Sequence, residues 1–377
     1  MKNLFKKMLC CTLAFLCLPV SCMMYGCDSE MTPENEDTTP AQTEPETEEP
    51  FVYENKIYNT LEHVDKFKIV GRSTLTDTGI AADWSGSGVE FYAQCKGAIR
   101  ASITSSDANS FAVIVDGEFV KDIDVKAGTN TYFLTGDLSE GVHHVRLLKQ
   151  RAYIYLKKGL LASIDSITVK GALLERPADK EYLIEVIGDS IASGGGTAPE
   201  HTLPMALNSF GFLLAEKLNA DYSLVCTPGL STYATSLHVH TLYEWQNAFR
   251  DNTTKYTTDR PADLVVIHLN ANDYQKLHAL YDETPFKNSV KTLLNNVYTI
   301  HGKDVKIVWF FEMMVKEETG DQWVREVFDE MGGESAGLYY LNVTQNQQGG
   351  NKHPSAQAHK VVCDELYQFI QSKNLLD

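Results

Sequence analysis

Five apolar runs in the second half of the chain alternate with segments of helical periodicity, and this alternation constrains the fold more than any other feature. The runs are residues 182–187, 222–226, 263–269, 305–311 and 338–343. The helical segments are residues 208–219, 241–250, 286–302, 321–332 and 354–373. Almost continuously apolar strands that alternate with helices are typical of a parallel sheet covered on both faces. The sequence therefore predicts a three-layer α/β/α domain over residues 176–377.

The preceding part, residues 51–175, has a different texture. It consists of short runs of alternating polarity, separated by Gly, Asn and Asp, and no stretch keeps helical periodicity for ten residues. Asp116 and Gly117 are typical of a tight hairpin turn. The expected strands are residues 88–95, 98–105, 110–120, 131–136, 141–150 and 162–171. We expect an all-β domain here, an antiparallel sandwich.

The first 27 residues have the pattern of an export signal. Lys2, Lys6 and Lys7 precede the apolar run 8–18, which is too short to span a bilayer. Gly26 and Cys27 end a stretch that resembles a bacterial lipoprotein cleavage box, in which the cysteine becomes the lipidated N-terminus. Cys22 is the second candidate for lipidation, and a plain secretory signal is the alternative interpretation.

Residues 28–50 form a segment rich in Thr, Pro and Glu. It contains nine acidic residues, no Lys or Arg, and almost nothing apolar to bury, so it should remain extended and solvated. Such a segment is typical of a spacer. We therefore expect an exported protein held at the bacterial cell surface by a lipid anchor in the membrane, or secreted if the anchor is absent.

Charge and cysteine content exclude several classes of protein. The formal net charge of −17 argues against a nucleic-acid partner, because binding phosphates requires a basic face. If cleavage occurs before Cys27, Cys95, Cys226 and Cys363 remain, and no pair has metal-ligand spacing. There is no HExxH motif either. The sequence thus indicates no disulfide framework, no metal and no cofactor.

Three polar stretches follow predicted strands of the second half. They are residues 188–194, 270–274 and 351–359. In parallel sheets, ligands bind beyond the carboxyl ends of the strands. Taken singly, each stretch has an ordinary explanation, since Asp189 or Ser190 could cap a helix, Asn272 could lie in a turn, and His353 could be exposed beside a first-turn proline.

Taken together, the three stretches indicate nucleophilic catalysis. A serine hydroxyl attacks only when a nearby base accepts its proton, and neutral imidazole does so near physiological pH. Fixed amide donors would then stabilise the alkoxide that forms. Ser190, His353 and Asn272 supply one residue of each kind.

The order of these residues resembles that of the SGNH (GDSL-type) hydrolases. The resemblance implies that Ser190 is the nucleophile and His353 the base. It also implies an oxyanion hole formed by the main-chain N–H groups of Ser190 and Gly229 and the side chain of Asn272. Gly229 is matched only by its type and its position after a strand.

The sequence departs from the SGNH pattern at two positions. Asn270 replaces the usual glycine of the third motif, and Gly350 replaces the aspartate that normally lies three residues before the histidine. Another group must therefore orient His353. A backbone carbonyl near residues 347–352 could do so in a Ser–His dyad, an acid could arrive from elsewhere, or the enzyme could be weakened or inactive.

A β-sandwich that precedes an SGNH domain resembles carbohydrate esterase family 2. Residues 83–97 and the hairpin around Asp116 carry this resemblance, which implies a jelly-roll-like first domain and the removal of acetyl groups from plant polysaccharides such as xylan and glucomannan. Some members of that family work with a Ser–His dyad, as the missing aspartate would require. A catalytically lapsed carbohydrate-binding protein and a lipid or small-ester esterase are the alternatives.

Aromatic side chains could offer flat faces to sugar rings. The candidates are Trp84, Trp245, Trp323, Tyr233, Tyr243 and Tyr274. Tyr274, beside the third motif, is the preferred substrate contact, and Trp309 is expected in the core of the sheet.

Overall fold

The structure is a computed structural model. It describes residues 50–151, 161–198, 205–233, 255–269, 271–277, 282–314, 318–344 and 348–376, together with Val239, Tyr243 and Lys316. Within it, Phe51–Asp377 form one compact unit. The expected signal, linker and lipidation sites lie outside the described residues, as do Asn270 and nearly all of the helix expected at 241–250. None of the described helices has the length and hydropathy that crossing a bilayer requires.

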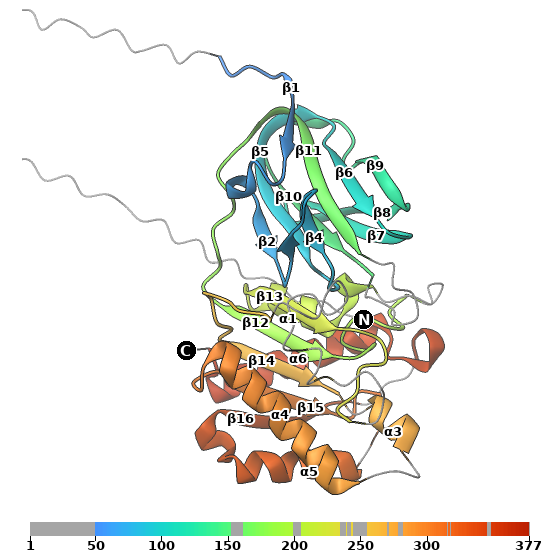
Figure 1. Ribbon diagram of the computed structural model, residues 1–377, viewed down its shortest axis with the longest axis vertical. Coiled ribbons are helices and arrows are strands. Elements are labelled where there is room, and N and C mark those ends of the chain that lie inside the picture. Colours follow the sequence, from blue (N-terminus) through green and yellow to red (C-terminus); the bar gives the residue numbers. More distant parts are fainter. Residues whose placement is uncertain are drawn as a thin grey trace, which may run out of the picture. The chain divides into compact units, whose positions relative to one another are not determined.

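The first part of the described chain is a two-layer antiparallel sandwich (Figure 1). Its strands are β1 (Asn55–Asn59), β2 (Lys68–Val70), β3 (Thr74–Leu75), β4 (Ile80–Ala82), β5 (Gly88–Gly97), β6 (Arg100–Ser105), β7 (Asn109–Val115), β8 (Glu118–Val125), β9 (Gly128–Phe133), β10 (Leu138–Lys149) and β11 (Ala162–Leu173). One layer follows the order β9-β6-β11-β4 and the other β8-β7-β10-β5, and β11 pairs within both. The predicted sandwich is confirmed.

The second part contains a parallel sheet of five strands in the order β13-β12-β14-β15-β16. The strands are β12 (Leu183–Gly188), β13 (Asp221–Cys226), β14 (Leu264–His268), β15 (Lys306–Phe311) and β16 (Leu338–Asn342). The described helices are α1 (Phe210–Lys217), α3 (Ala271–Leu277), α4 (Glu283–His301), α5 (Glu318–Glu330) and α6 (Ala356–Lys373). Residues of α1 and α6 pack on one face of the sheet, and those of α4 and α5 pack on the other. The predicted α/β/α architecture is therefore confirmed.

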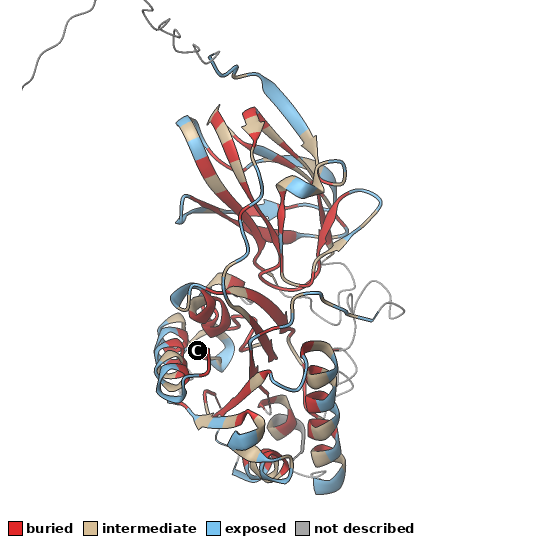
Figure 2. Cartoon of the chain, turned by 90° about the vertical axis from the view of Figure 1, so that its left-hand side faces the viewer, coloured by how far each residue is buried: buried red, intermediate tan, exposed pale blue. Residues whose placement is uncertain are grey.

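Side-chain alternation along the strands explains why helices cover both faces. On β12, Val186 packs with α1 and α6, whereas its neighbour Ile187 packs with α4 and α5. Both side chains are fully buried, and Figure 2 shows the parallel strands largely in the colour of buried residues. Full burial of such a side chain contributes roughly 1.5–3 kcal/mol. Successive apolar residues of a strand thus face opposite sides of the sheet, which is why both sides need a layer of helices.

The topology of the parallel sheet positions the candidate site. From β12 the chain continues to β13 on one side of the sheet and then to β14 on the other side. The carboxyl ends of β12 and β14 thus flank a topological switch point, where ligand-binding crevices form in open α/β sheets. Ser190 follows β12, and Asn272 follows β14.

A buried ion pair joins the sandwich to the parallel sheet. Arg72, which follows β2, binds both carboxylate oxygens of Glu185 on β12 at 3.0–3.2 Å. Tyr243 and His301 also contact this carboxylate, at 2.6 and 3.0 Å. Burial acts to raise the pKa of Glu185, but the charge of Arg72 and these two contacts hold that pKa well below its ordinary value. The carboxylate is therefore ionised and fully paired.

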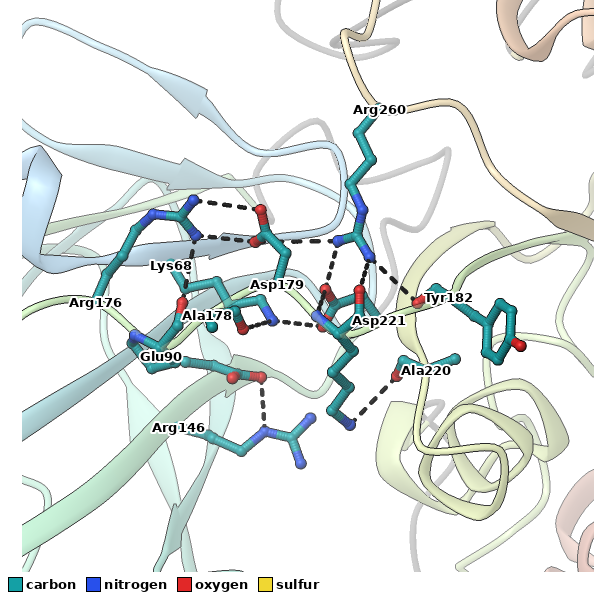
Figure 3. Close-up of polar contacts among 12 residues, drawn as sticks. Lys68, Glu90, Arg146, Arg176, Ala178, Asp179, Tyr182, Ala220, Asp221 and Arg260 are labelled. Carbon is teal, nitrogen blue, oxygen red and sulfur yellow. Dashed lines mark hydrogen bonds and ion pairs between the residues drawn. The ribbon is translucent and has the colours of Figure 1, made fainter.

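A second polar cluster lies at the amino ends of β12 and β13 (Figure 3). Lys68 donates to Asp221 at 2.6 Å and to the carbonyl of Ala178 at 2.9 Å. Arg260 binds Asp221 as well, and Arg146 donates to Glu90 at 2.9 Å. The five charged residues line a pocket at the amino ends of the strands, whereas Ser190 follows the carboxyl end of β12. Because the Lys and Arg side chains of this cluster already have carboxylate partners, we interpret the cluster as structural and not as a ligand-binding site.

Candidate active site

Ser190 lies on a tight turn directly after β12. The main chain continues as successive turns and not as a helix, with Ser193 N donating to Asp189 O and Gly195 N donating to Ser190 O. The carboxylate of Asp189 accepts the N–H of Ile191 at 2.8 Å. No helix follows in the described residues 191–198, so neither side chain caps one, and Asp189 instead closes a turn. The hydroxyl of Ser190 makes a different contact.

His353 lies within hydrogen-bonding distance of Ser190. Nε2 of the imidazole is 2.8 Å from the Ser190 hydroxyl oxygen, and Nδ1 is 3.2 Å from the carbonyl oxygen of Asn351. A carbonyl can only accept, so Nδ1 carries the proton of the neutral ring. Nε2 is then unprotonated and can accept the proton of the serine hydroxyl. Of the three possibilities left by Gly350, the geometry matches the backbone carbonyl.

The segment around His353 has an unusual backbone conformation. Asn351 and Lys352 have φ values of 55° and 62°, a region that non-glycine residues seldom adopt. The main-chain N–H of Gly350 donates to the carbonyl of Gly196 at 2.9 Å, and His353 N donates to Gly350 O at 3.1 Å. These bonds fix the backbone that places the Asn351 carbonyl at Nδ1 of the imidazole.

The glycine run after Ser190 makes room for His353. A Cβ on Gly196 would lie 2.4 Å from the Cβ of His353, and Gly196 has φ +80°. A Cβ on Gly195 would lie 3.1 Å from Cδ2 of the imidazole and 2.6 Å from the carbonyl oxygen of Ser190. Close backbone approach thus requires glycine here. The run is a visible sequence signal whose function the sequence alone did not indicate.

Asn272 lies in the first turn of α3 beside the residue that precedes Ser190. Its Nδ2 donates to the carbonyl of Leu230 at 2.8 Å and to the carboxylate of Asp189 at 3.2 Å. Gly229 lies next to Leu230 in a turn closed by a bond from Leu230 N to Thr227 O, and has φ +85°. The structure therefore brings the second and third predicted motifs together at the site of Ser190.

Asp273 is a site residue that the sequence analysis missed. Its side chain is fully buried and accepts the N–H groups of Thr232 and Tyr233 at 2.8 and 2.7 Å, which fixes the loop that contains Gly229. Burial raises the pKa of Asp189 to about 7, and the charge of Asp273 adds to this effect. The acidic residue directly after Asn272 in the third motif is the sequence signal that could have indicated that Asp273 fixes this loop.

Most of the aromatic candidates for sugar stacking are in the core. Trp84 is only 1% exposed and Tyr243 is fully buried, so the prediction that they offer open faces is wrong. Tyr233 and Trp323 pack against the same core cluster, and Trp309 is buried as expected. Trp245 lies outside the described residues. Tyr274 is partly buried on α3, and its contact with substrate stays a prediction.

The fold and this set of side chains define a class. A five-stranded parallel sheet between helices carries a serine after its first strand, an asparagine after its third and a histidine before its last helix. Serine and histidine are in hydrogen-bonding contact, and the asparagine lies beside them. This is the architecture of an SGNH-type hydrolase.

Sequence comparisons indicate the family within this class. Residues 69–152 match the family model described as carbohydrate esterase 2 N-terminal. The chain is 29% identical over 332 residues to the cellulase/esterase CelE of Acetivibrio thermocellus. The match covers 80% of this chain but 39% of that relative, so the chain spans well under half of its length.

Solved structures agree with the sequence comparisons. A family two carbohydrate esterase from Clostridium thermocellum, in complex with cellohexaose, superposes with a TM-score of 0.73 at 26% identity, covering 82% of this chain and 100% of that one. An acetyl xylan esterase, Est2A, from the rumen bacterium Butyrivibrio proteoclasticus gives a TM-score of 0.76 at 17% identity over 86% of this chain and all of its own, a similarity of fold. The resemblance to family 2 carbohydrate esterases is thereby confirmed.

Proposed function

We propose that this protein is a serine esterase that removes acyl groups from carbohydrate through a covalent intermediate. The observation that carries the proposal is the 2.8 Å contact between Ser190 Oγ and His353 Nε2. Ser190 Oγ attacks the ester carbonyl carbon while its proton passes to Nε2. The tetrahedral intermediate then collapses, and the sugar oxygen leaves with that proton. Water then gives a proton to the same imidazole and attacks the acyl-serine, and the acid is released as Ser190 Oγ takes that proton back.

Fixed donors would stabilise the negative oxygen of the intermediate. We assign this role to the main-chain N–H groups of Ser190 and Gly229 and to the Nδ2 group of Asn272. Ser190 and Gly229 lie on the loops that follow β12 and β13, and Asn272 lies in the first turn of α3, which follows β14. Removing one such donor typically lowers kcat by about 10²–10³-fold.

The substrate that we propose is an O-acetylated plant polysaccharide, with xylan and glucomannan as the first candidates. Two observations support it. The first part of the chain matches the N-terminal domain model of carbohydrate esterases, and a structural relative at 26% identity is a carbohydrate esterase in complex with cellohexaose. Tyr274, beside Asn272, is the proposed contact for the sugar.

Acetate release tests this proposal. Purified protein and a Ser190→Ala variant are incubated with acetylated xylan, acetylated glucomannan and a series of aryl esters of increasing chain length. We expect acetate from at least one polysaccharide, loss of that release in the variant, and slower turnover as the acyl chain lengthens. Binding without release would favour the lapsed carbohydrate-binding protein. Preference for long chains would favour a lipid esterase.

We further propose that the protein is exported and lipid-anchored through Cys27. The support is the sequence of residues 1–50, in which a basic start, a short apolar run and a cysteine precede an acidic spacer. Cys27→Ala should move the protein from the membrane fraction to the soluble fraction of cells, whereas the matched Cys22→Ala should not. The reverse result would assign lipidation to Cys22.

A further inference from the structure

The carboxyl group of Asp189 has two partners, one on each oxygen. Oδ1 accepts the N–H of Ile191 at 2.8 Å, and Oδ2 accepts from Nδ2 of Asn272 at 3.2 Å. Asp189 is completely buried and immediately precedes Ser190. A carboxyl group can be buried at such a place only at a cost in stability, so a compensating function is to be expected.

The side-chain amide of Asn272 has two edges of opposite character. Its nitrogen donates and its oxygen accepts, and the two are nearly equal in size. Only the nitrogen can stabilise a negative oxygen on the substrate, because the amide oxygen would repel it. The activity of Asn272 therefore depends on which edge faces the substrate.

Two hydrogen-bond acceptors in the structure determine how the amide of Asn272 is oriented. The carbonyl of Leu230 accepts from Nδ2 at 2.8 Å, and Asp189 accepts from the same nitrogen at 3.2 Å. We propose that Asp189 is a positioning residue, whose carboxyl group holds the nitrogen of Asn272 toward the place where the ester oxyanion forms. This inference rests on the esterase function proposed above. The longer of the two bonds is the one whose hydrogen can be shared with the substrate oxygen.

Replacing the carboxyl group by an amide should disturb this arrangement. In Asp189→Asn, the side-chain oxygen can still accept from Ile191, but an NH₂ group then faces the NH₂ group of Asn272. Rotation of either amide relieves that contact and creates another unfavourable one, at Leu230 or at Ile191. The nitrogen of Asn272 is thus misoriented, while the bond from the N–H of Ile191 to the side chain of residue 189 is kept.

The test is a double-mutant cycle on a soluble aryl acetate with four variants: Asp189→Asn, Asn272→Ala, the double variant and Ser190→Ala. We expect Asp189→Asn and Asn272→Ala each to lower kcat by about 10²–10³-fold with little change in KM. The kcat of the double variant should be no lower than that of Asn272→Ala alone, because Asp189 acts only through Asn272. Asp321→Asn, which removes a buried carboxylate of α5, is the control and should keep wild-type kcat.

Wild-type kcat in Asp189→Asn would overturn the inference, and so would losses that multiply in the double variant, since a merely structural effect would be independent of Asn272. An unchanged rate in Ser190→Ala would instead overturn the esterase proposal. If Asp189→Asn does not fold, a measurement on the wild-type protein replaces it. The side-chain NH₂ signals of Asn272, observed with ¹⁵N-asparagine, should shift when a phosphonate modifies Ser190, and unshifted signals would contradict the placement of that nitrogen.

Discussion

Ser190 and His353 are 163 positions apart in the chain, yet the hydroxyl oxygen of one lies 2.8 Å from Nε2 of the other. Among the described residues, the partner of the other ring nitrogen, Nδ1, is the carbonyl of Asn351. A carbonyl fixes the same tautomer as an aspartate would, but it brings a dipole in place of a full charge. The geometry is therefore that of the proposed nucleophile and base, with a carbonyl in the place of an acidic third member.

Gly196→Ala should reduce activity without unfolding the protein. The new Cβ would lie 2.4 Å from the Cβ of His353 and within 3.0 Å of two carbonyl oxygens, so the imidazole must move away from Ser190. We expect kcat/KM for an aryl acetate to fall at least tenfold, because misplacement by about 1 Å can cost about 10²-fold.

Gly302→Ala is the matched control for this change. Gly302 has φ +86° and ends α4, and its added Cβ would meet no atom within 4 Å. An alanine there would be strained by its positive φ, at a cost of about 1–3 kcal/mol, but it would not collide with any side chain. Equal losses of activity in the two variants would mean that backbone strain explains the effect, and not the displacement of His353 by the added Cβ.

The stability of the protein should depend on the ionisation of Asp189. Its pKa is raised from 3.8 to about 7, first by burial and then by Asp273, and the thiol of Cys226 also lies within range of its charge. The native state therefore binds a proton that the unfolded chain has lost between about pH 4 and pH 7. Its contribution to stability is fully present below pH 4 and is lost as pH rises through 7.

Urea unfolding at several pH values checks this expectation. The free energy of unfolding of the wild-type protein, minus that of Asp189→Asn, should fall by ~2–4 kcal/mol between pH 4 and pH 8. A difference that is independent of pH would show that Asp189 titrates normally in the folded protein.

The buried pair between Arg72 and Glu185 should be needed to hold the sandwich against the parallel sheet. Arg72→Met leaves the Glu185 carboxylate buried without its main partner, which typically costs about 3–5 kcal/mol. Arg176→Met, which breaks an exposed pair with Asp179, should cost no more than about 1 kcal/mol. Thermal unfolding measures both, and a similar small cost for the two variants would contradict a structural role for the pair of Arg72 and Glu185.

The sequence predicts the five parallel strands to within about a residue, because strands buried on both faces must be almost wholly apolar. From the positions of these strands it also predicts that Ser190 and Asn272 lie at the carboxyl ends of the sheet. It could not predict that Asn351 orients His353, since this contact depends on two residues with positive φ and on a bond to Gly196. The expectation that Trp84 and Tyr243 have exposed ring faces is wrong for a related reason, because tertiary packing decides which aromatic rings stay exposed.

The most direct test of the central claim compares four proteins in the hydrolysis of an aryl acetate: the wild type, Ser190→Ala, His353→Ala and the double variant. If the two side chains work as one nucleophile–base unit, each single variant should lose activity by about 10³-fold or more. The double variant should then be no worse than either single one, with all four proteins folded. Wild-type turnover in Ser190→Ala, or losses that multiply in the double variant, would contradict the account.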